Sequence, residues 1–310
     1  MKKSRFLSVL LAMLLVFSMV FSFAAMAASV PSPADQAADN DHHAITGLTG
    51  LRNARDLGGY YTADGQYQVK SGLLFRCAKL YDATDADIAV LQSLGVTKVI
   101  DLRMLFERTT KPDKSVPGAQ NIWISTQTIP NILVITGEDW MAMLKAIRSG
   151  VMDTYMTNMY RQLITDPVAI WGTKRFFNEV LSADGAPILW HCTSGKDRTG
   201  IEALLLLAAL GVDEDVIRAE YLNTNWFMAD DMQASYDKAY KYTHSNRIAM
   251  EFYKYEGVQE SWLDVALNVI HRYGTIQDYL RDVIGLTDAD FAQLQATYLE
   301  PAAAALAPAA

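Results

Sequence analysis

The chain has 310 residues and a formal net charge of −8, from 35 acidic and 27 basic side chains. Removing the three cations of the N-terminal segment (Lys2, Lys3 and Arg5) changes −8 to −11. This acidic balance argues against nucleic acid or an anionic membrane as the main partner. Two cysteines are too few for a disulfide framework, and the length allows one α/β domain after the N-terminal segment.

Residues 1–27 have the pattern of a secretory signal peptide. Three cations precede an apolar run over residues 6–23, and Ala25-Met26-Ala27 offers small residues for cleavage. The apolar run is long for a signal peptide, so an uncleaved membrane anchor is the alternative. We expect an exported protein that is secreted, or held in the cell envelope outside the cytoplasm, after the signal peptide is cleaved.

The rest of the chain divides into three parts by composition. Residues 28–46 contain two prolines and a polar, acidic stretch, which predicts a linker. Residues 47–300 carry the alternating apolar patterns of a folded domain. Residues 301–310 form an alanine-rich, low-complexity tail, which we expect to be flexible.

Four short apolar runs predict the strands of this domain: residues 72–76, 97–102, 121–124 and 187–190. Helical patterns separate most of them, including one that begins after Thr84 and ends at Gly95. The alternation predicts an α/β sheet with helices on both faces. Ligands of such sheets bind beyond the carboxyl ends of the strands, where the turns at residues 101–108 and 191–199 fall.

Residues 129–166 form a helical region rich in methionine, which admits two interpretations. Methionine fills irregular gaps in a protein core, and it also suits a mobile lid over a binding site. The two interpretations stay open at this stage. The C-terminal third, residues 213–299, has helical patterns almost throughout and is expected to provide packing.

The segment from His191 to Gly200, HCTSGKDRTG, carries the strongest chemical signal of the chain. It lies between the last predicted strand and a helical pattern over residues 201–210, so it occupies a strand-to-helix loop. Loop amides and the dipole of the following helix create a cradle for an anion. Cys192 at the start of the loop would face that anion, which is the arrangement for nucleophilic attack on a phosphate ester.

Each residue of the loop has an expected role in this chemistry. A helix N-terminus and a nearby guanidinium lower the pKa of a thiol, so Cys192 is predicted to attack as the thiolate. Arg198 offers a planar fork to two phosphate oxygens, which lysine lacks. The backbone amides of residues 193–198, which include Thr193 and Ser194, would bind the other phosphate oxygens. Gly195 would let the loop turn where a side chain would collide with the anion, and Thr199 would place a hydroxyl near the sulfur.

The Cys-x5-Arg core resembles the phosphate-binding loop of the cysteine-dependent protein tyrosine phosphatases, and the longer form resembles the secreted bacterial group, some of whose members also hydrolyse phosphoinositides. Further segments are similar to that group in the same order: Asn53 to Tyr60, Leu74 to Leu80, Val99 to Arg103 with Glu107, and Arg272 to Leu299. Cys77 replaces the serine that the group carries after its strand. The resemblance implies the tyrosine phosphatase-like fold, with a central, mostly parallel sheet flanked by helices, a helical lid and a helical C-terminal part.

The leaving group needs a proton, and two carboxyl groups are candidates for the general acid. The resemblance implies Asp197, inside the loop. Asp101, at the end of a neighbouring predicted strand, is the rival, and its alternative role is a salt bridge with Arg103 or a turn that accepts amide hydrogens.

Four further residues have an expected role. Lys196 either widens the positive field of the cradle toward a phosphate or is solvated. His191 is expected to shape the loop by hydrogen bonding and to stabilise the thiolate. Arg55 and Asp56 are expected to form a buried structural pair that ties the N-terminal segment to the sheet, with a direct role in substrate binding as the alternative.

Cys77 is either inert and buried or forms a reversible disulfide with Cys192. The five histidines show no spacing typical of metal ligands, with one another or with the cysteines, so we expect no metal and no cofactor.

The sequence thus predicts an exported phosphatase that hydrolyses phosphotyrosine, with dual or phosphoinositide specificity also open, through a phosphocysteine intermediate. The expected partner is a phosphorylated protein or a lipid headgroup, with no nucleic acid. An inositol polyphosphate phosphatase and a non-catalytic binder of phosphorylated ligands are the alternatives.

Overall fold

The computed structural model describes residues 32, 35–36, 43–127 and 140–302. The predicted signal peptide lies outside the described residues, as do most of the predicted linker and residues 303–310 of the predicted tail. Among the described residues, no helix is both long and apolar enough to span a membrane.

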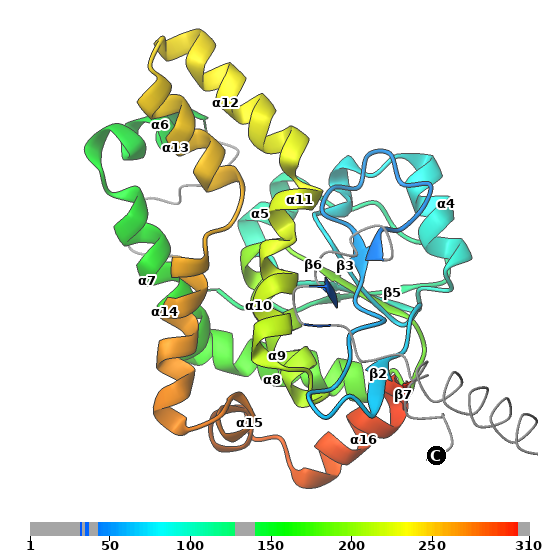
Figure 1. The fold of residues 1–310 in the computed structure, drawn as a ribbon. Coiled ribbons are helices and arrows are strands. Elements are labelled where there is room, and N and C mark those ends of the chain that lie inside the picture. Colours follow the sequence, from blue (N-terminus) through cyan, green and yellow to red (C-terminus); the bar gives the residue numbers. More distant parts are fainter. Residues whose placement is uncertain (1–31, 33–34, 37–42, 128–139, 303–310) are drawn as a thin grey trace, which may run out of the picture.

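A five-stranded sheet in the order β1-β3-β6-β4-β5 forms the centre of the molecule (Figure 1). Its strands are β1 (Arg55–Asp56), β3 (Leu74–Cys77), β4 (Lys98–Asp101), β5 (Gln120–Trp123) and β6 (Ile188–His191). All pairings are parallel except the short pairing of β1 with β3. The four predicted strands and the mostly parallel sheet are therefore confirmed. A separate antiparallel pair, β2 (Tyr67–Val69) and β7 (Leu299–Pro301), was not expected.

The register of the sheet places three chemically active positions at one edge. Cys77 lies opposite His191 on one side, and Asp101 lies opposite His191 on the other. All three end their strands, so the side chains after β3, β4 and β6 meet at the carboxyl edge, where a ligand of a parallel sheet binds.

Two apolar clusters cover the two faces of the sheet. The smaller cluster joins Phe75, Leu189 and Val99 of the strands to Leu91 of helix α4 (Asp85–Ser93). Thr84 caps that helix through its hydroxyl, with Asp87 completing a capping box, as the sequence pattern predicted.

The larger cluster joins the opposite face to helices α8 (Pro167–Leu181), α9 (Asp197–Ala209) and α10 (Glu214–Leu222). Helix α9 is buried over almost all of its length against β3 and β6. Apolar residues all round a helix are expected where it lies inside a core, so the run of leucines at 204–207 fixes α9 behind the central strand.

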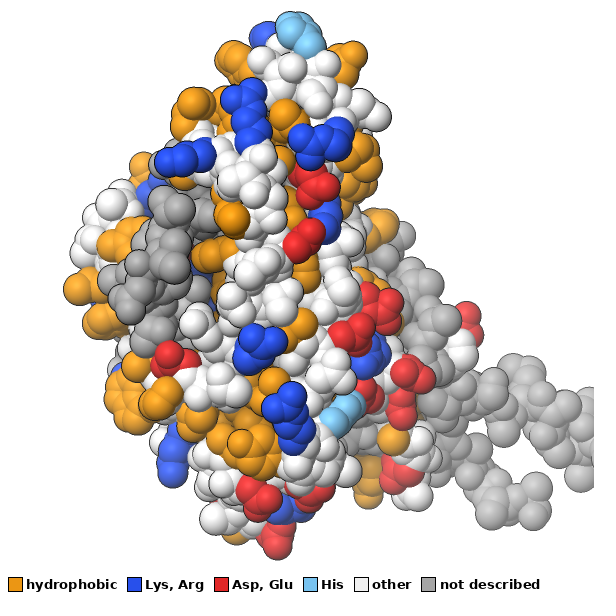
Figure 2. Space-filling model, turned by 90° about the vertical axis from the view of Figure 1, so that its left-hand side faces the viewer, with side chains coloured by type: hydrophobic (Ala, Val, Ile, Leu, Met, Phe, Trp, Pro, Cys, Tyr) orange, Lys and Arg blue, Asp and Glu red, His pale blue; other side chains and the backbone are white. Residues whose placement is uncertain are grey.

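A second helical layer stands beside this core, at the left of Figure 1. Its helices are α6 (Trp140–Ser149), α7 (Met152–Thr165), α12 (Ala229–Thr243), α13 (Asn246–Glu256) and α14 (Glu260–Ile270). Helices α12 and α13 form a hairpin that points upward, and α7 packs along α14. On the face in Figure 2, Lys and Arg side chains gather over the upper arm of this layer.

The remaining elements are short or close the C-terminal end. They are α5 (Leu105–Thr110), α11 (Thr224–Phe227), α15 (Ile276–Tyr279), the π-helical turn η4 (Leu280–Ile284), α16 (Asp288–Tyr298), and the 3₁₀ turns η2 (Leu80–Asp82) and η3 (His271–Tyr273). The helical C-terminal part is thus confirmed.

The packed domain extends slightly past both predicted boundaries. His43, inside the predicted linker, is buried and stacks on Tyr60 with ring centroids 4.3 Å apart. At the other end, Pro301 belongs to β7 and Ala302 is fully buried, so the first residues of the predicted tail are part of the fold.

Candidate active site

The loop from Cys192 to Lys196 joins the central strand β6 to the N-terminus of α9. Cys192 is 2% exposed, and Asp197 and Arg198 are the first residues of α9. The strand–loop–helix arrangement predicted from the sequence is present, and the helix N-terminus points its free amides at the loop.

Neighbouring segments bind the loop through its carbonyl oxygens. Asn53 Nδ2 donates to Ser194 O (3.2 Å) and Gly195 O (2.8 Å), and Arg76 Nη2 donates to Gly195 O (2.7 Å). The Lys79 amide donates to Thr193 O (3.2 Å). In a trans peptide, N–H and C=O point in opposite directions. The N–H groups that follow these carbonyls therefore point away from the surrounding donors, toward the interior of the loop.

Gly195 is required by the neighbouring strand rather than by a bound anion. Its φ is +67°, and a Cβ at this position would lie 2.2 Å from the carbonyl oxygen of Cys77. We expected a side chain at this position to collide with the bound anion. In the structure it would instead collide with the end of β3, because the loop passes too close to that strand for any side chain.

Arg198 is held in place by Glu107 of α5. Arg198 Nη1 lies 2.6 Å from Glu107 Oε2 and Nη2 lies 2.8 Å from Oε1, a bidentate pair. Thr193 Oγ1 also donates to Glu107. Burial would raise the pKa of Glu107, but Arg198 and then these hydrogen bonds outweigh it and lower the pKa to about 2. Two of the five guanidinium donors bind Glu107, and Nη2 also lies 3.5 Å from Thr193 Oγ1, which leaves the remaining N–H groups for an anion.

The surroundings of Cys192 favour its thiolate form. Burial raises the pKa of the thiol, yet the charge of Arg198 and the hydroxyl of Thr199 overcome this effect, so the net shift is downward. Thr199 Oγ1 is buried and has no hydrogen-bond partner within the described part of the chain, so its hydroxyl is available to the sulfur.

A cavity of about 270 Å³ opens above the loop. The loop lines it with Cys192, Thr193, Ser194, Lys196, Asp197 and Arg198, and helices α6 and α7 line it with Met143, Met152, Met156 and Met159. These four methionines are also buried in the larger apolar cluster, whereas Met141 is exposed. The methionine-rich helices therefore serve as both core and roof, and the part of this region at residues 129–139 lies outside the described residues.

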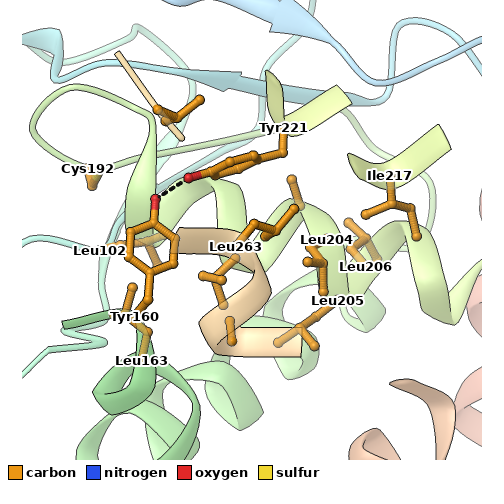
Figure 3. Packing of buried hydrophobic residues seen from close by; sticks show 14 of the residues in the cluster. Leu102, Tyr160, Leu163, Cys192, Leu204, Leu205, Leu206, Ile217, Tyr221 and Leu263 are labelled. Carbon is orange, nitrogen blue, oxygen red and sulfur yellow. Dashed lines mark hydrogen bonds between the residues drawn. The ribbon is translucent and has the colours of Figure 1, made fainter. Parts of the chain in front are cut away.

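Asp197 lines the cavity together with Cys192, as do the carboxyl groups of Glu107 and Glu256. Tyr160 of α7 donates its hydroxyl hydrogen to Asp197 Oδ1 (2.7 Å). The same hydroxyl lies 2.6 Å from that of Tyr221, and Figure 3 shows the two hydroxyls pointing toward each other near Cys192. Because Tyr160 donates to Asp197, Tyr221 is the donor in the second bond, with the carbonyl oxygen of Gln259 as a longer acceptor at 3.4 Å. The two tyrosines fix one oxygen of Asp197.

Asp101 lies outside that cavity. Arg103 donates to its two carboxylate oxygens at 2.9 Å each, and Arg108 Nε is 3.5 Å away. Burial raises the pKa of Asp101, but His191 and Arg103 more than offset it and lower the pKa to about 2. Asp101 lines a separate cavity of about 120 Å³. The salt bridge with Arg103, named as its alternative role, is present.

His191 shapes the loop through a buried polar network. Its Nε2 lies 3.3 Å from Asp113 Oδ2, and its Nδ1 is 3.1 Å from the carbonyl oxygen of Cys192. Burial lowers the pKa of His191, but the bond to Asp113 and the charge of Asp101 raise it overall. The Nδ1–H can donate to the Cys192 carbonyl, and a protonated ring forms an ion pair with Asp113.

Asp101, Asp113 and His191 each bring a potential ligand atom within 4.8 Å of the others, although their sequence spacing gives no hint of it. Arg103 already binds both carboxylates. A metal ion would have to displace this guanidinium, so the donor set fits an ion-pair network better than a cation.

Lys196 is buried rather than solvated. Its ammonium donates to the carbonyl oxygens of Tyr255 (2.5 Å) and Gly257 (2.8 Å), at the end of α13, and lies 5.8 Å from the Trp262 ring centroid. It lines the cavity of Cys192 while tying the loop to the helical layer.

The expected ion pair between Arg55 and Asp56 is wrong. Arg55 Nε binds Glu220 Oε1 at 2.8 Å, and Arg76 Nη1 binds Glu220 Oε2 at 2.9 Å. Burial raises the pKa of Glu220, but the two guanidiniums outweigh it and lower the pKa. Asp56 instead accepts the amide hydrogens of Gly58 and Gly72.

The side chains of Cys77 and Cys192 belong to different apolar clusters, on opposite faces of the sheet. Burial comes first among the causes that raise the pKa of Cys77 well above its usual value. Both features favour the inert interpretation of Cys77.

Several functional positions could not be assigned from the sequence. They are Asn53, Arg76, Glu107, Asp113, Tyr160 and Glu220. They support the loop from other elements, directly or through a partner. Asn53, Arg76 and Glu107 lie in segments that resemble the family, whereas Asp113, Tyr160 and Glu220 had no signal in the sequence.

A buried thiol beside an arginine, in an amide-lined loop at a helix N-terminus, defines an α/β protein built to hold a phosphate group next to a sulfur atom. Residues 46–300 match the tyrosine phosphatase family. The chain belongs to this family and is a phosphoric monoester hydrolase of the tyrosine phosphatase type.

Two relatives in sequence agree with this assignment over most of the chain. A Cupriavidus necator protein named as a tyrosine-protein phosphatase is 33% identical over 251 residues, which are 80% of this chain and 86% of that protein. The triple specificity protein phosphatase PtpB of Mycobacterium tuberculosis is 29% identical over 83% of this chain and 99% of its own length. The crystal structure of P. aeruginosa TpbA with pTyr matches with a TM-score of 0.28 and 16% identity, over 68% of this chain and 94% of that chain.

Proposed function

We propose that this protein is an exported phosphatase that hydrolyses phosphotyrosine through a phosphocysteine at Cys192. The observation that carries the proposal is that Cys192, with its lowered pKa, and Arg198, held by Glu107, line the same cavity. A phosphate seated on the loop amides between them has its phosphorus facing the sulfur.

In the first step, the Cys192 thiolate attacks phosphorus, the S–P bond forms and the bond from phosphorus to the tyrosyl oxygen breaks. The free N–H groups of Arg198 and the loop amides stabilise the equatorial oxygens as charge spreads over them. The departing phenoxide takes a proton from a carboxylic acid.

Asp197 is the better placed acid. It lines the cavity, and the bond from Tyr160 to Oδ1 leaves the other carboxyl oxygen to carry the transferable proton. Asp101 is held ionised by Arg103 and lines a different cavity.

In the second step, water attacks the phosphocysteine. Asp197, now a carboxylate, takes a proton from the water, the S–P bond breaks, and inorganic phosphate leaves. The Thr199 hydroxyl donates to the sulfur and stabilises the thiolate as it is released.

The roof of the cavity supports an aryl ester as substrate. Methionines 143, 152, 156 and 159 lie above the polar loop, and a phenyl ring attached to the bound phosphate would contact thioethers rather than charges. The name of the Mycobacterium relative, a triple specificity phosphatase, supports assays on phosphoserine, phosphothreonine and lipid phosphates beside phosphotyrosine.

Export is the second part of the proposal. It rests on the cations, apolar run and small residues of positions 1–27. Expression of the full chain should yield a product outside the cytoplasm whose N-terminus begins after Ala27. A product found only in the cytoplasm with an intact N-terminus would contradict it.

The activity test uses Cys192→Ser with aryl phosphates. We expect hydrolysis to fall to background while phosphate analogues still bind, because the anion cradle is unchanged. Hydrolysis by the wild type should not respond to a metal chelator. A chain that binds phosphorylated ligands without turnover in the wild type would be a binder instead.

Asp197→Asn and Asp101→Asn separate the two candidate acids. Loss of the true acid costs about 10²–10⁴-fold with leaving groups of high pKa and much less with nitrophenol. We expect this pattern for Asp197→Asn, and for Asp101→Asn a loss that does not depend on the leaving group.

A further inference from the structure

A second hollow lies beside the catalytic cavity. This groove, of about 520 Å³, is lined on one side by apolar residues of the segment before β1, including Leu48, and on the other by Trp226 and Phe227 of α11. In Figure 1 the segment before β1 runs next to α11 and the lower end of α12. No step of the proposed reaction uses the groove.

Arg52 connects the groove to the site of catalysis, since it lines both hollows. Its Nη1 lies 3.0 Å from Asp231 Oδ1, in the groove, and 3.6 Å from Glu256 Oε1, in the catalytic cavity. The next residue, Asn53, lines the groove and binds the loop carbonyls of Ser194 and Gly195. Asn53 therefore contacts both the groove and the loop that forms the anion cradle.

The aromatic wall of the groove is fixed from behind. The Arg55 guanidinium lies 5.0 Å from the centroid of the Phe227 ring, and Phe227 and Trp226 meet edge to face at 4.8 Å. Trp226 is nevertheless 51% exposed. A half-exposed indole beside apolar residues is the type of surface that contributes most to protein recognition.

The rim of the groove is acidic. Asp230 is exposed and Asp231 is shared with Arg52, the cation among the residues that line the groove. This rim repels a second phosphate or an acidic segment and attracts Lys or Arg.

We propose that the groove binds the peptide segment next to the phosphorylated tyrosine of a protein substrate, with an apolar side chain against Trp226 and a Lys or Arg side chain near Asp230. This inference rests on the proposed function, because the cradle positions the phosphotyrosine from which the segment extends. The groove would let the enzyme select among phosphorylated proteins through contacts that a small aryl phosphate does not make.

The test compares kcat/KM for p-nitrophenyl phosphate with that for three phosphotyrosine peptides, flanked by Leu and Lys, by Ala, or by Leu and Glu. The wild type should prefer the first peptide. Trp226→Ala should lower kcat/KM for it about tenfold, through KM, and leave p-nitrophenyl phosphate within about twofold. Asp230→Lys should reverse the preference between the Lys and Glu peptides.

Trp171→Ala is the matched control. Trp171 is 55% exposed on α8 and lines neither the catalytic cavity nor the groove, so its loss should change no substrate. Equal kcat/KM for the three peptides would overturn the proposed role of the groove. So would a Trp226→Ala effect of the same size on p-nitrophenyl phosphate. Failure of the wild type to hydrolyse any aryl phosphate would instead overturn the proposed function.

Discussion

At the scale of single residues, the site works by setting one charge against another among buried side chains. Cys192 is buried, which opposes its ionisation, and Arg198 reverses that effect only because Glu107 holds the guanidinium in place. Arg198 in turn keeps Glu107 ionised, and Glu107 holds the Arg198 guanidinium, which stays protonated in any case, beside Cys192.

Tyr160 offers a sharp test of how Asp197 is positioned. Tyr160→Phe removes the hydrogen bond to Asp197 Oδ1 and leaves the ring. We expect kcat to fall about tenfold for poor leaving groups and little for nitrophenol, with KM unchanged, because a misdirected acid matters most where protonation is difficult.

Tyr298→Phe provides the comparison for that variant. Tyr298 is as buried, and its hydroxyl donates to the carbonyl oxygen of Val180, away from the cavity. It should lose similar stability and no activity. If the rate falls equally for all leaving groups in Tyr160→Phe, the tyrosine has a packing role alone.

The sequence was informative where chemistry is local. Cys192, Arg198 and Asp197 lie within one loop, so their spacing predicted their grouping in one cavity. The residues that hold this loop in shape, such as Asn53 and Glu220, come from segments about 30 to 140 positions away. The sequence pattern around a polar residue does not indicate a partner so far away along the chain. For this reason the sequence predicts a pair of Arg55 with its neighbour Asp56, whereas Arg55 pairs with Glu220.

At the scale of elements, periodicity predicted the four parallel strands because each is a short apolar run between helices. Strand β1 has two residues and β7 follows directly on α16, so neither has a run long enough to detect. The methionine-rich helices could not be assigned to core or roof from composition, since the same side chains do both in the folded chain.

Gly195 marks the place where two elements come closest. In Gly195→Ala, the added Cβ would meet the end of β3 at 2.2 Å, and its φ of +67° is unfavourable for alanine. Because backbone must move, the loop amides leave their positions, and we expect at least about a hundredfold loss of kcat/KM.

Gly118→Ala separates that contact from backbone strain. Gly118 has a φ of +85° with no atom within 4 Å of the added Cβ, so the variant should lose roughly 1–2 kcal/mol of unfolding free energy and keep its activity. Rates for both variants, with unfolding curves, give the comparison. Full activity in Gly195→Ala would mean that the loop tolerates the displacement.

At the scale of the whole molecule, two apolar clusters enclose the sheet, and one carboxyl group lies in the larger of them without an ion pair among the described residues. Glu202 of α9 is 1% exposed. Thr173 donates to its Oε1 at 2.9 Å, while Oε2 has no partner in the described part of the chain. Burial raises the pKa of Glu202 to about 8, against a weaker opposite effect of Thr173.

This shift makes the stability of the fold depend on pH in a defined direction. Between about pH 4.5 and 8 the folded chain keeps a proton on Glu202 that the unfolded chain releases, so the unfolding free energy falls as pH rises. The loss is at most about 1.4 kcal/mol per pH unit, or about 5 kcal/mol over the whole window. It is absent below that window, where both states are protonated.

Glu202→Gln keeps the shape and cannot ionise, so urea unfolding between pH 5 and 8.5 should show a flatter dependence in this variant than in the wild type. The variant should gain most in relative stability at pH 8.5. Glu260→Gln, at an exposed carboxyl group that shares none of this burial, should run parallel to the wild type. Parallel curves for Glu202→Gln and the wild type would mean that water reaches Glu202 and that the larger cluster is open at this point.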